Sequence, residues 1–108
     1  MTFNEYQDSS KNTAKYSKSR AYDYLVMGLC GEAGEVANKY KKIIRDQDGV
    51  LTPEAKAKIA DELGDVLWYL ARLANELGYD LEHIAKNNIA KLISRNERGV
   101  VGGDGDNR

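Results

Sequence analysis

The chain has 108 residues, of which 42% are hydrophobic and 31% are charged, and its formal net charge is −1 at pH 7. This length allows one domain with one modest core, and the near-zero charge excludes the broad electrostatic attraction that binds a nucleic-acid polymer. No stretch approaches the roughly 20 apolar residues that span a bilayer, and the N-terminus lacks the basic start and apolar block of a signal peptide. The single cysteine, Cys30, cannot form an internal disulfide, so we expect a cytoplasmic protein without a membrane partner.

The N-terminal half carries signals for two helices. Thr2 and Glu5 have the spacing of a capping box, which predicts a short helix through about residue 15. A long second helix is predicted over about residues 21–45, because apolar residues recur there every three or four positions and so share one face. These residues are Leu25, Leu29, Ala33, Val36, Tyr40 and Ile43.

The C-terminal half carries signals for two more helices. Thr52 and Pro53 predict the N-cap and first residue of a third helix that stops at Gly78, and Asp80 is the predicted cap of a fourth, to about residue 95. The inward faces are expected to consist of Ile59, Leu63, Val66, Leu67, Leu70 and Leu77 in the third helix, and of Leu81, Ala85, Ile89 and Leu92 in the fourth. We therefore predict an all-α, four-helix bundle-like domain over residues 1–98 and an irregular, glycine-rich tail over residues 99–108.

Two pairs of carboxylates border the apolar faces of the second and third helices. Glu32 and Glu35 lie three residues apart, as do Glu62 and Asp65, so each pair shares one helix surface. Because the two helices should pack antiparallel, the four carboxylates are expected to converge. Their mutual repulsion is tolerable when a cation neutralises them, and all-oxygen ligation suits Mg²⁺, with Mn²⁺ as an alternative. Single pairs of this kind usually belong to solvated faces, but two pairs on consecutive helices favour a metal site.

Glycines support this interpretation. Gly28 and Gly31 fall on the same side of the second helix as Glu32, where missing side chains allow close approach of a ligand or a neighbouring helix. Gly34 and Gly64 point elsewhere and are expected to serve tight helix packing.

The segments GLCGEAGEVANKYKK and DELGDVLWYLARLANELG resemble the ExxE and ExxD signature of the MazG-like, all-α NTP pyrophosphohydrolases, and the resemblance extends to NIAKLISR. The resemblance implies magnesium-dependent hydrolysis of an NTP or dNTP to the NMP or dNMP and pyrophosphate. The catalytic metal ligands it implies are Glu32, Glu35, Glu62 and Asp65. It also implies a homo-oligomer, a dimer or a tetramer, with active sites near the subunit interface.

Five further residues are candidates for substrate binding. Asn88, Lys91 and Arg95 share one face of the fourth helix, and the resemblance suggests that they contact phosphate or sugar. The other interpretation of these residues is a solvated cationic helix end. Lys39 fits phosphate binding and an ordinary pair with the glutamate four residues earlier equally well. Tyr69 is expected to stack on a base or bond a sugar.

Other aromatic and apolar residues lie off the main stripes. We expect Trp68 at a subunit contact, and an apolar interface that also includes Tyr22, Tyr24 and Val26. The ending GDGDNR is either disordered or folds over the nucleotide or a neighbouring subunit.

Two other functions are compatible with parts of the sequence. A carboxylate-bridged di-iron or di-manganese bundle needs Glu-x-x-His pairs, and the nearest approach is Asp80-x-x-His83 at a helix cap. The main alternative is a non-catalytic helical interaction module with an acidic metal-binding surface, which gives no reason for glycines beside the acids.

Overall fold

The structure, a computed structural model, describes residues 1–106, which form four α-helices and no strand. The helices are α1 (Phe3–Ser10), α2 (Ala21–Gln47), α3 (Pro53–Glu76) and α4 (Leu81–Glu97), and 3-10 turns at Lys11–Thr13 and Lys18–Arg20 join α1 to α2. The all-α prediction is confirmed. Helix α1 ends earlier than predicted because the chain passes into the first 3-10 turn. Within residues 1–106 no helix is long and apolar enough to cross a membrane.

The helix ends follow the predicted chemistry with one exception. Thr2 Oγ1 accepts a hydrogen bond from the Glu5 amide (3.1 Å), and the Glu5 carboxylate accepts one from the Thr2 amide (2.9 Å), which completes the capping box. Thr52 caps α3, and Gly78, at φ +81°, ends the turn that follows α3. Asp80 occupies the N-cap position of α4, but its side chain makes no capping hydrogen bond within the described residues.

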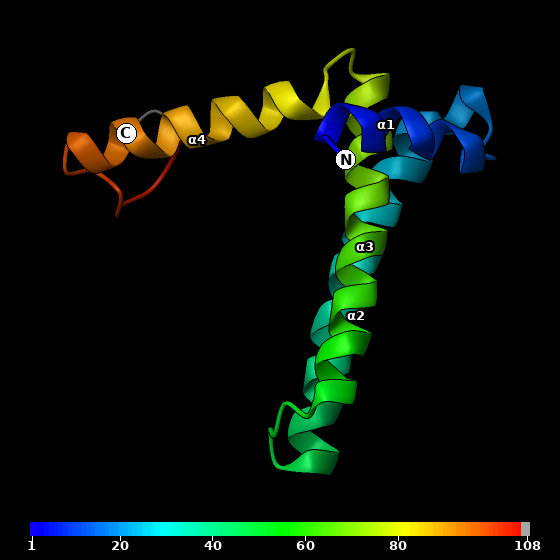
Figure 1. Ribbon diagram of the computed structural model, residues 1–108, viewed down its shortest axis with the longest axis vertical. Helices are drawn as coiled ribbons and strands as arrows, with labels where there is room; N and C mark the ends of the chain where they lie inside the picture. The colour runs from blue at the N-terminus through cyan, green and yellow to red at the C-terminus, as the bar shows by residue number, and fades with distance from the viewer. Residues whose placement is uncertain (107–108) are drawn as a thin grey trace.

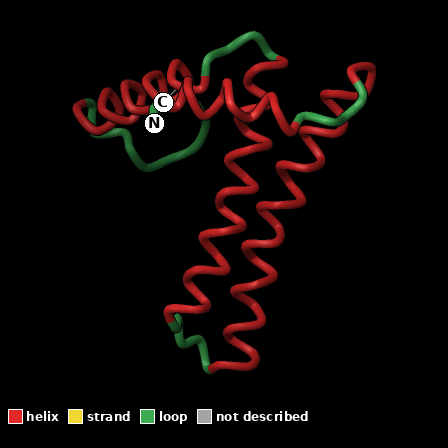
Figure 2. The backbone as a smooth tube through the Cα atoms, turned by 45° about the vertical axis from the view of Figure 1, so that its right-hand side comes forward, coloured by secondary structure: helices red, strands yellow, loops and turns green. Residues whose placement is uncertain are grey.

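Helices α2 and α3 form a long antiparallel hairpin, α1 crosses its open end, and α4 leaves this junction in another direction (Figures 1 and 2). The radius of gyration is 16.8 Å, whereas a compact chain of this length has about 13 Å. The packed part of the chain therefore consists of the hairpin of α2 and α3, with α1 and the start of α4 at its open end.

The core lies where α1, α2 and α3 meet. Leu25 and Ala71 are completely buried there, and Leu81 at the start of α4 is 4% exposed. Further along α4, Ile89 and Leu92 are 57% and 42% exposed. The prediction that these two face inward is wrong for the single chain, because no element within residues 1–106 covers that side of α4. In the hairpin, exposed side chains include three that were predicted to face inward: Tyr40, Leu63 and Leu77.

Buried polar side chains fix the junction between the helices. Gln7 Nε2 donates to the backbone oxygens of Ala71 (3.3 Å) and Tyr79 (3.0 Å), and its Oε1 accepts from the Leu81 amide (2.8 Å). One side chain of α1 therefore holds the end of α3, the connecting turn and the start of α4, and it satisfies backbone groups that water does not reach. The direction of α4 is set at this point.

Candidate functional site

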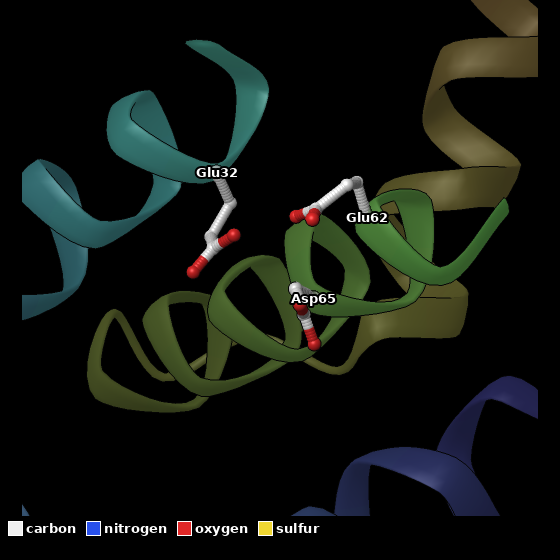
Figure 3. A group of neighbouring side chains, drawn as sticks. All are labelled: Glu32, Glu62 and Asp65. Atoms are coloured by element: carbon white, nitrogen blue, oxygen red, sulfur yellow. The ribbon is translucent and has the colours of Figure 1, made fainter. Parts of the chain in front are cut away.

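Three of the four predicted carboxylates meet between α2 and α3. Glu32 of α2 points toward Glu62 of α3, and Asp65 follows on the next turn of α3 (Figure 3). One oxygen from each of these side chains lies within 4.8 Å of the other two. Glu35 is exposed and does not belong to the group among the described residues. The i, i+3 spacing and the antiparallel hairpin together produce this convergence.

The electrostatics of the cluster show the strain expected of gathered acids. Partial burial raises the pKa of Glu32, and a hydrogen bond with Glu62 and the charges of Asp65, Glu62 and Glu35 raise it further. All of these causes disfavour the charged form of Glu32, so the cluster is short of positive charge. Lys39 supplies part of it, since its Nζ lies 3.0 Å from Glu62 Oε1, and this bond raises the pKa of Lys39.

The donor set fits a hard divalent cation. All three converging side chains offer carboxylate oxygens, which Mg²⁺ and Mn²⁺ prefer over the nitrogen and sulfur ligands of softer metals. A cation would compensate the negative charge gathered by Glu32, Glu62 and Asp65. The metal that the sequence predicts is thus compatible with these residues, and Glu32, Glu62 and Asp65 are the ones placed to hold it.

The glycines have more varied roles than expected. A side chain at Gly28 would overlap the ring of Tyr69, so this glycine admits an aromatic side chain of α3. Gly31, which was predicted to leave room near Glu32, faces open space. The packing role predicted for Gly34 and Gly64 is not seen, since a Cβ at either would meet nothing within 4 Å among the described residues.

An aromatic cluster lies beside the acids. Tyr69 contacts Tyr24 and Trp68 at centroid distances of 5.9 and 5.0 Å, and Tyr16 stacks on Tyr24 at 5.5 Å. A hydrogen bond with Tyr24, followed by burial, raises the pKa of Tyr69 to about 12, so its hydroxyl stays protonated. Trp68 Nε1 donates to Thr13 Oγ1 (2.8 Å), so Trp68 contacts the N-terminal segment of its own chain.

A cavity of about 290 Å³ adjoins the cluster on the side of the hairpin's closed end. Three lysines line it: Lys39, Lys42 and Lys58. Two carboxylates also line it, and one of them, Asp46, is bound by Arg45 (2.8 and 2.9 Å). Sequence reasoning overlooked Lys58, although its position four residues before Glu62 places it on the same side of α3.

The candidates on α4 lie in a different region. Asn88 and Lys91 line an open cavity of about 470 Å³ that is bounded by α4 and the turn before it. Arg95 is buried, and both Lys91 and Arg95 face the carboxylate of Asp106 in the tail. None of these α4 residues joins the acidic group within the described part of the chain. Asn107 and Arg108, the last residues of the GDGDNR ending, lie outside the described residues.

The comparisons with known proteins agree with this geometry. Residues 20–100 match the model of the MazG nucleotide pyrophosphohydrolase domain. The chain belongs to the MazG family. It is also 50% identical over 109 residues to the "Gene 37 protein" of Mycobacterium phage L5, in a comparison that covers 95% of this chain and 96% of the phage protein. No solved structure matches the chain. The MazG match spans α2, α3 and α4, and so contains every predicted site residue, whereas α1 and most of the tail fall outside it.

Proposed function

We propose that this MazG protein is a magnesium-dependent nucleotide pyrophosphohydrolase that converts an NTP or dNTP to the NMP or dNMP and pyrophosphate. The convergence of Glu32, Glu62 and Asp65 carboxylate oxygens within 4.8 Å carries the proposal. An interaction surface gains nothing from carboxylates held this close, because their repulsion lowers stability unless a cation is bound.

In the proposed reaction, water adds to the α-phosphorus, the bond from this phosphorus to the bridging oxygen breaks, and pyrophosphate leaves. Glu32, Glu62 and Asp65 would hold a divalent ion of the magnesium class, which would supply charge compensation for the phosphate oxygens. Glu35 lies one turn from Glu32 and outside the group, so it is free to orient the water and accept its proton.

The lysine-lined cavity is suited to the leaving group. Pyrophosphate gains negative charge as the anhydride bond breaks, and Lys39, Lys42 and Lys58 line a space next to Glu62. Lys39 contacts both regions, because its Nζ is 3.0 Å from Glu62 Oε1 while its stem lines the cavity. Lysines placed here stabilise that charge as it develops.

We also propose that the protein acts as a homo-oligomer, a dimer or a tetramer. Ile89 and Leu92 leave an apolar face of α4 uncovered, and a second copy of the chain is the simplest partner for it. Assembly could also bring Lys91 and Arg95 close to the acidic cluster of a second copy of the chain, because the cluster of their own chain lies in a different region. Sedimentation equilibrium tests this point, and a single-chain mass at micromolar concentration would contradict it.

The activity test combines substrates and variants. The protein is incubated with Mg²⁺ and a panel of NTPs and dNTPs, and monophosphate and pyrophosphate are resolved by chromatography. We expect Glu62→Gln to lower kcat by about a hundredfold or more, because it removes an oxygen of the charge-stabilising cluster. The matched control is Asp61→Asn, an exposed carboxylate on the adjacent position of α3 that is not in the group, and it should retain activity.

Two results separate the proposal from the alternative of a non-catalytic module. Release of pyrophosphate that depends on Mg²⁺ and on Glu62 supports the enzyme. Binding of Mg²⁺ without release of pyrophosphate from any nucleotide would leave only an acidic, metal-binding surface.

A further inference from the structure

The tail turns back onto α4 and places a carboxylate beside the two cations of that helix. Gly99, at φ +71°, makes the turn, and the Val100 amide donates to the Arg95 carbonyl (2.9 Å). This is the hydrogen bond of a glycine-terminated helix end, which redirects the chain sharply. The tail beneath the end of α4 can be followed in Figure 1, where it is red. Asp106 Oδ1 lies 3.5 Å from both Lys91 Nζ and Arg95 Nη2.

Arg95 is buried, yet its hydrogen bonding is incomplete within residues 1–106. The Arg95 side chain is 5% exposed, although α4 projects from the rest of the chain and the tail is the segment beside it. Its Nη2 donates to the Asp106 backbone oxygen at 2.9 Å and to the carboxylate at 3.5 Å, and its Nε has no partner within residues 1–106. A carboxylate that fully satisfies a guanidinium binds Nε and Nη2 together at about 2.8 Å. Asp106 therefore neutralises Arg95 without using its donors fully.

We propose that Asp106 is an internal competitor for the phosphate site of Lys91 and Arg95, so that a nucleotide must displace the tail to bind there. The proposal rests on the proposed function and on the phosphate contact that the family resemblance suggests for these two residues. A phosphate group presents more oxygens than one carboxylate, so it could accept from Lys91 Nζ and also from Arg95 Nε, which has no partner within residues 1–106. The tail thus acts as a latch, which closes an empty site and yields to a ligand of greater charge.

The geometry makes this contact exchangeable. The Asp106 side chain is 87% exposed, and Lys91 is 43% exposed, so water competes for both. Exposed ion pairs contribute little free energy, and the latch is therefore open for part of the time. The apparent affinity for phosphate is the intrinsic affinity multiplied by the open fraction, so weakening the latch tightens binding without any new contact.

The test measures binding without hydrolysis. Inorganic tripolyphosphate is titrated into the full chain in the presence of Mg²⁺ by calorimetry. Asp106→Asn should tighten binding by up to about fivefold, the upper limit that one exposed ion pair allows. Asp104→Asn is the matched control, since it removes the same charge from the same tail, and Asp104 has no ion pair with Lys91 or Arg95 among residues 1–106.

A second variant opens the latch without changing any charge. Gly99→Ala strains a position at φ +71° and so displaces the tail from its turn. It should tighten tripolyphosphate binding in the same direction as Asp106→Asn. Equal affinity of Asp106→Asn and the unaltered chain, or equal gains from Asp106→Asn and Asp104→Asn, would overturn the latch.

The variant Lys91→Met separates the latch from the phosphate-binding role of α4 on which it rests. A loss of tripolyphosphate affinity in Lys91→Met with no gain in Asp106→Asn leaves the phosphate site standing and removes the latch. No loss in Lys91→Met, or no binding to the unaltered chain, removes the phosphate role of α4 and the latch together. Pyrophosphate release from nucleotides is measured independently, so it tests the metal cluster in either case.

Discussion

Arg72 in α3 and Arg95 in α4 are almost equally buried, at 3% and 4% exposed, but their surroundings differ. Arg72 Nε donates to Ser10 Oγ (2.8 Å), and its Nη2 donates to the Gln7 carbonyl (2.9 Å), and both partners are themselves buried in α1. Arg95 contacts an exposed carboxylate eleven residues later and leaves its Nε unpartnered within residues 1–106. Burial alone therefore does not distinguish a structural arginine from one that is available to a ligand.

The difference lies in what each guanidinium satisfies. Gln7 and Ser10 are at the C-terminal end of α1, where backbone carbonyls lack helical partners and a cation is favourable. Arg72 thus completes a helix end and fastens α1 to the hairpin. Arg95 closes no helix end, because its own is closed by backbone bonds, and its Nη2 instead donates to the backbone oxygen and carboxylate of Asp106 in the tail. A phosphate-binding residue needs N–H donors that the fold does not use, and Arg95 Nε is such a donor within residues 1–106.

The largest expected effect is the loss of stability on removing Arg72. Arg72→Met keeps the volume but removes the donor to the buried Ser10 Oγ and one of the two donors to the Gln7 carbonyl, which also accepts from Ser10 Oγ. This should cost about 2–3 kcal/mol of unfolding free energy. Arg95→Met should cost less than about 1 kcal/mol, because its partner is exposed. Urea denaturation of both variants measures the contrast. Similar losses of unfolding free energy in the two variants would show that burial of the arginine, and not its hydrogen-bond partners, determines its contribution to stability.

A second contrast, smaller in energy, lies along α2. Gly28→Ala introduces a Cβ that overlaps the Tyr69 ring, and we expect it to cost about 1–3 kcal/mol as the ring is displaced. Gly34→Ala is the matched control in the same helix, where a Cβ meets nothing within 4 Å. It should gain up to about 1 kcal/mol from helix propensity. Stabilisation by both substitutions would mean that the ring of Tyr69 yields without cost.

Local signals in the sequence predicted the parts of the fold that depend on neighbouring residues. The capping box of Thr2 and Glu5, the start of α3 at Pro53 and the turn at Gly78 are all confirmed. The pairing of Glu32 with Glu62 also needed only helix spacing and an antiparallel hairpin. These features were predictable because residues three or four apart in a helix have fixed relative positions.

The course of α4 was not predictable in the same way. Periodicity shows that Ile89 and Leu92 share an apolar face with Leu81, but it does not show what covers that face. The direction of α4 depends on Gln7, more than 70 residues away in sequence, through its bonds to Tyr79 and Leu81. The identity of the glycine that receives Tyr69 depends in the same way on a pairing between helices.

The smallest effect concerns Glu32, which like Arg95 is an incompletely satisfied charged group and should respond to ions in solution. Its pKa is raised in the folded chain, by burial first, so the folded state holds a proton that the unfolded state has released. The unfolding free energy of the metal-free protein should therefore fall as the pH rises from 4.5, the ordinary value, through the raised pKa of Glu32. Glu5 has a lowered pKa, which gives a slope of opposite sign at lower pH.

The contribution of Glu32 is isolated as the difference between the unaltered chain and Glu32→Gln, each measured by denaturation in a chelator across this pH window. The unaltered chain should lose its stability advantage over Glu32→Gln as the pH rises. In Asp61→Asn the unfolding free energy should depend on pH as it does in the unaltered chain. Mg²⁺ should reverse the trend, because the cation binds the deprotonated cluster and stabilises the folded state more at higher pH, by about 2.7 kcal/mol at a hundred times its Kd. If neither Glu32→Gln nor Mg²⁺ changes the pH dependence of the unfolding free energy, the carboxylates do not share one charge-deficient site. Glu32 and Arg95 would then have in common only that each is shielded from water.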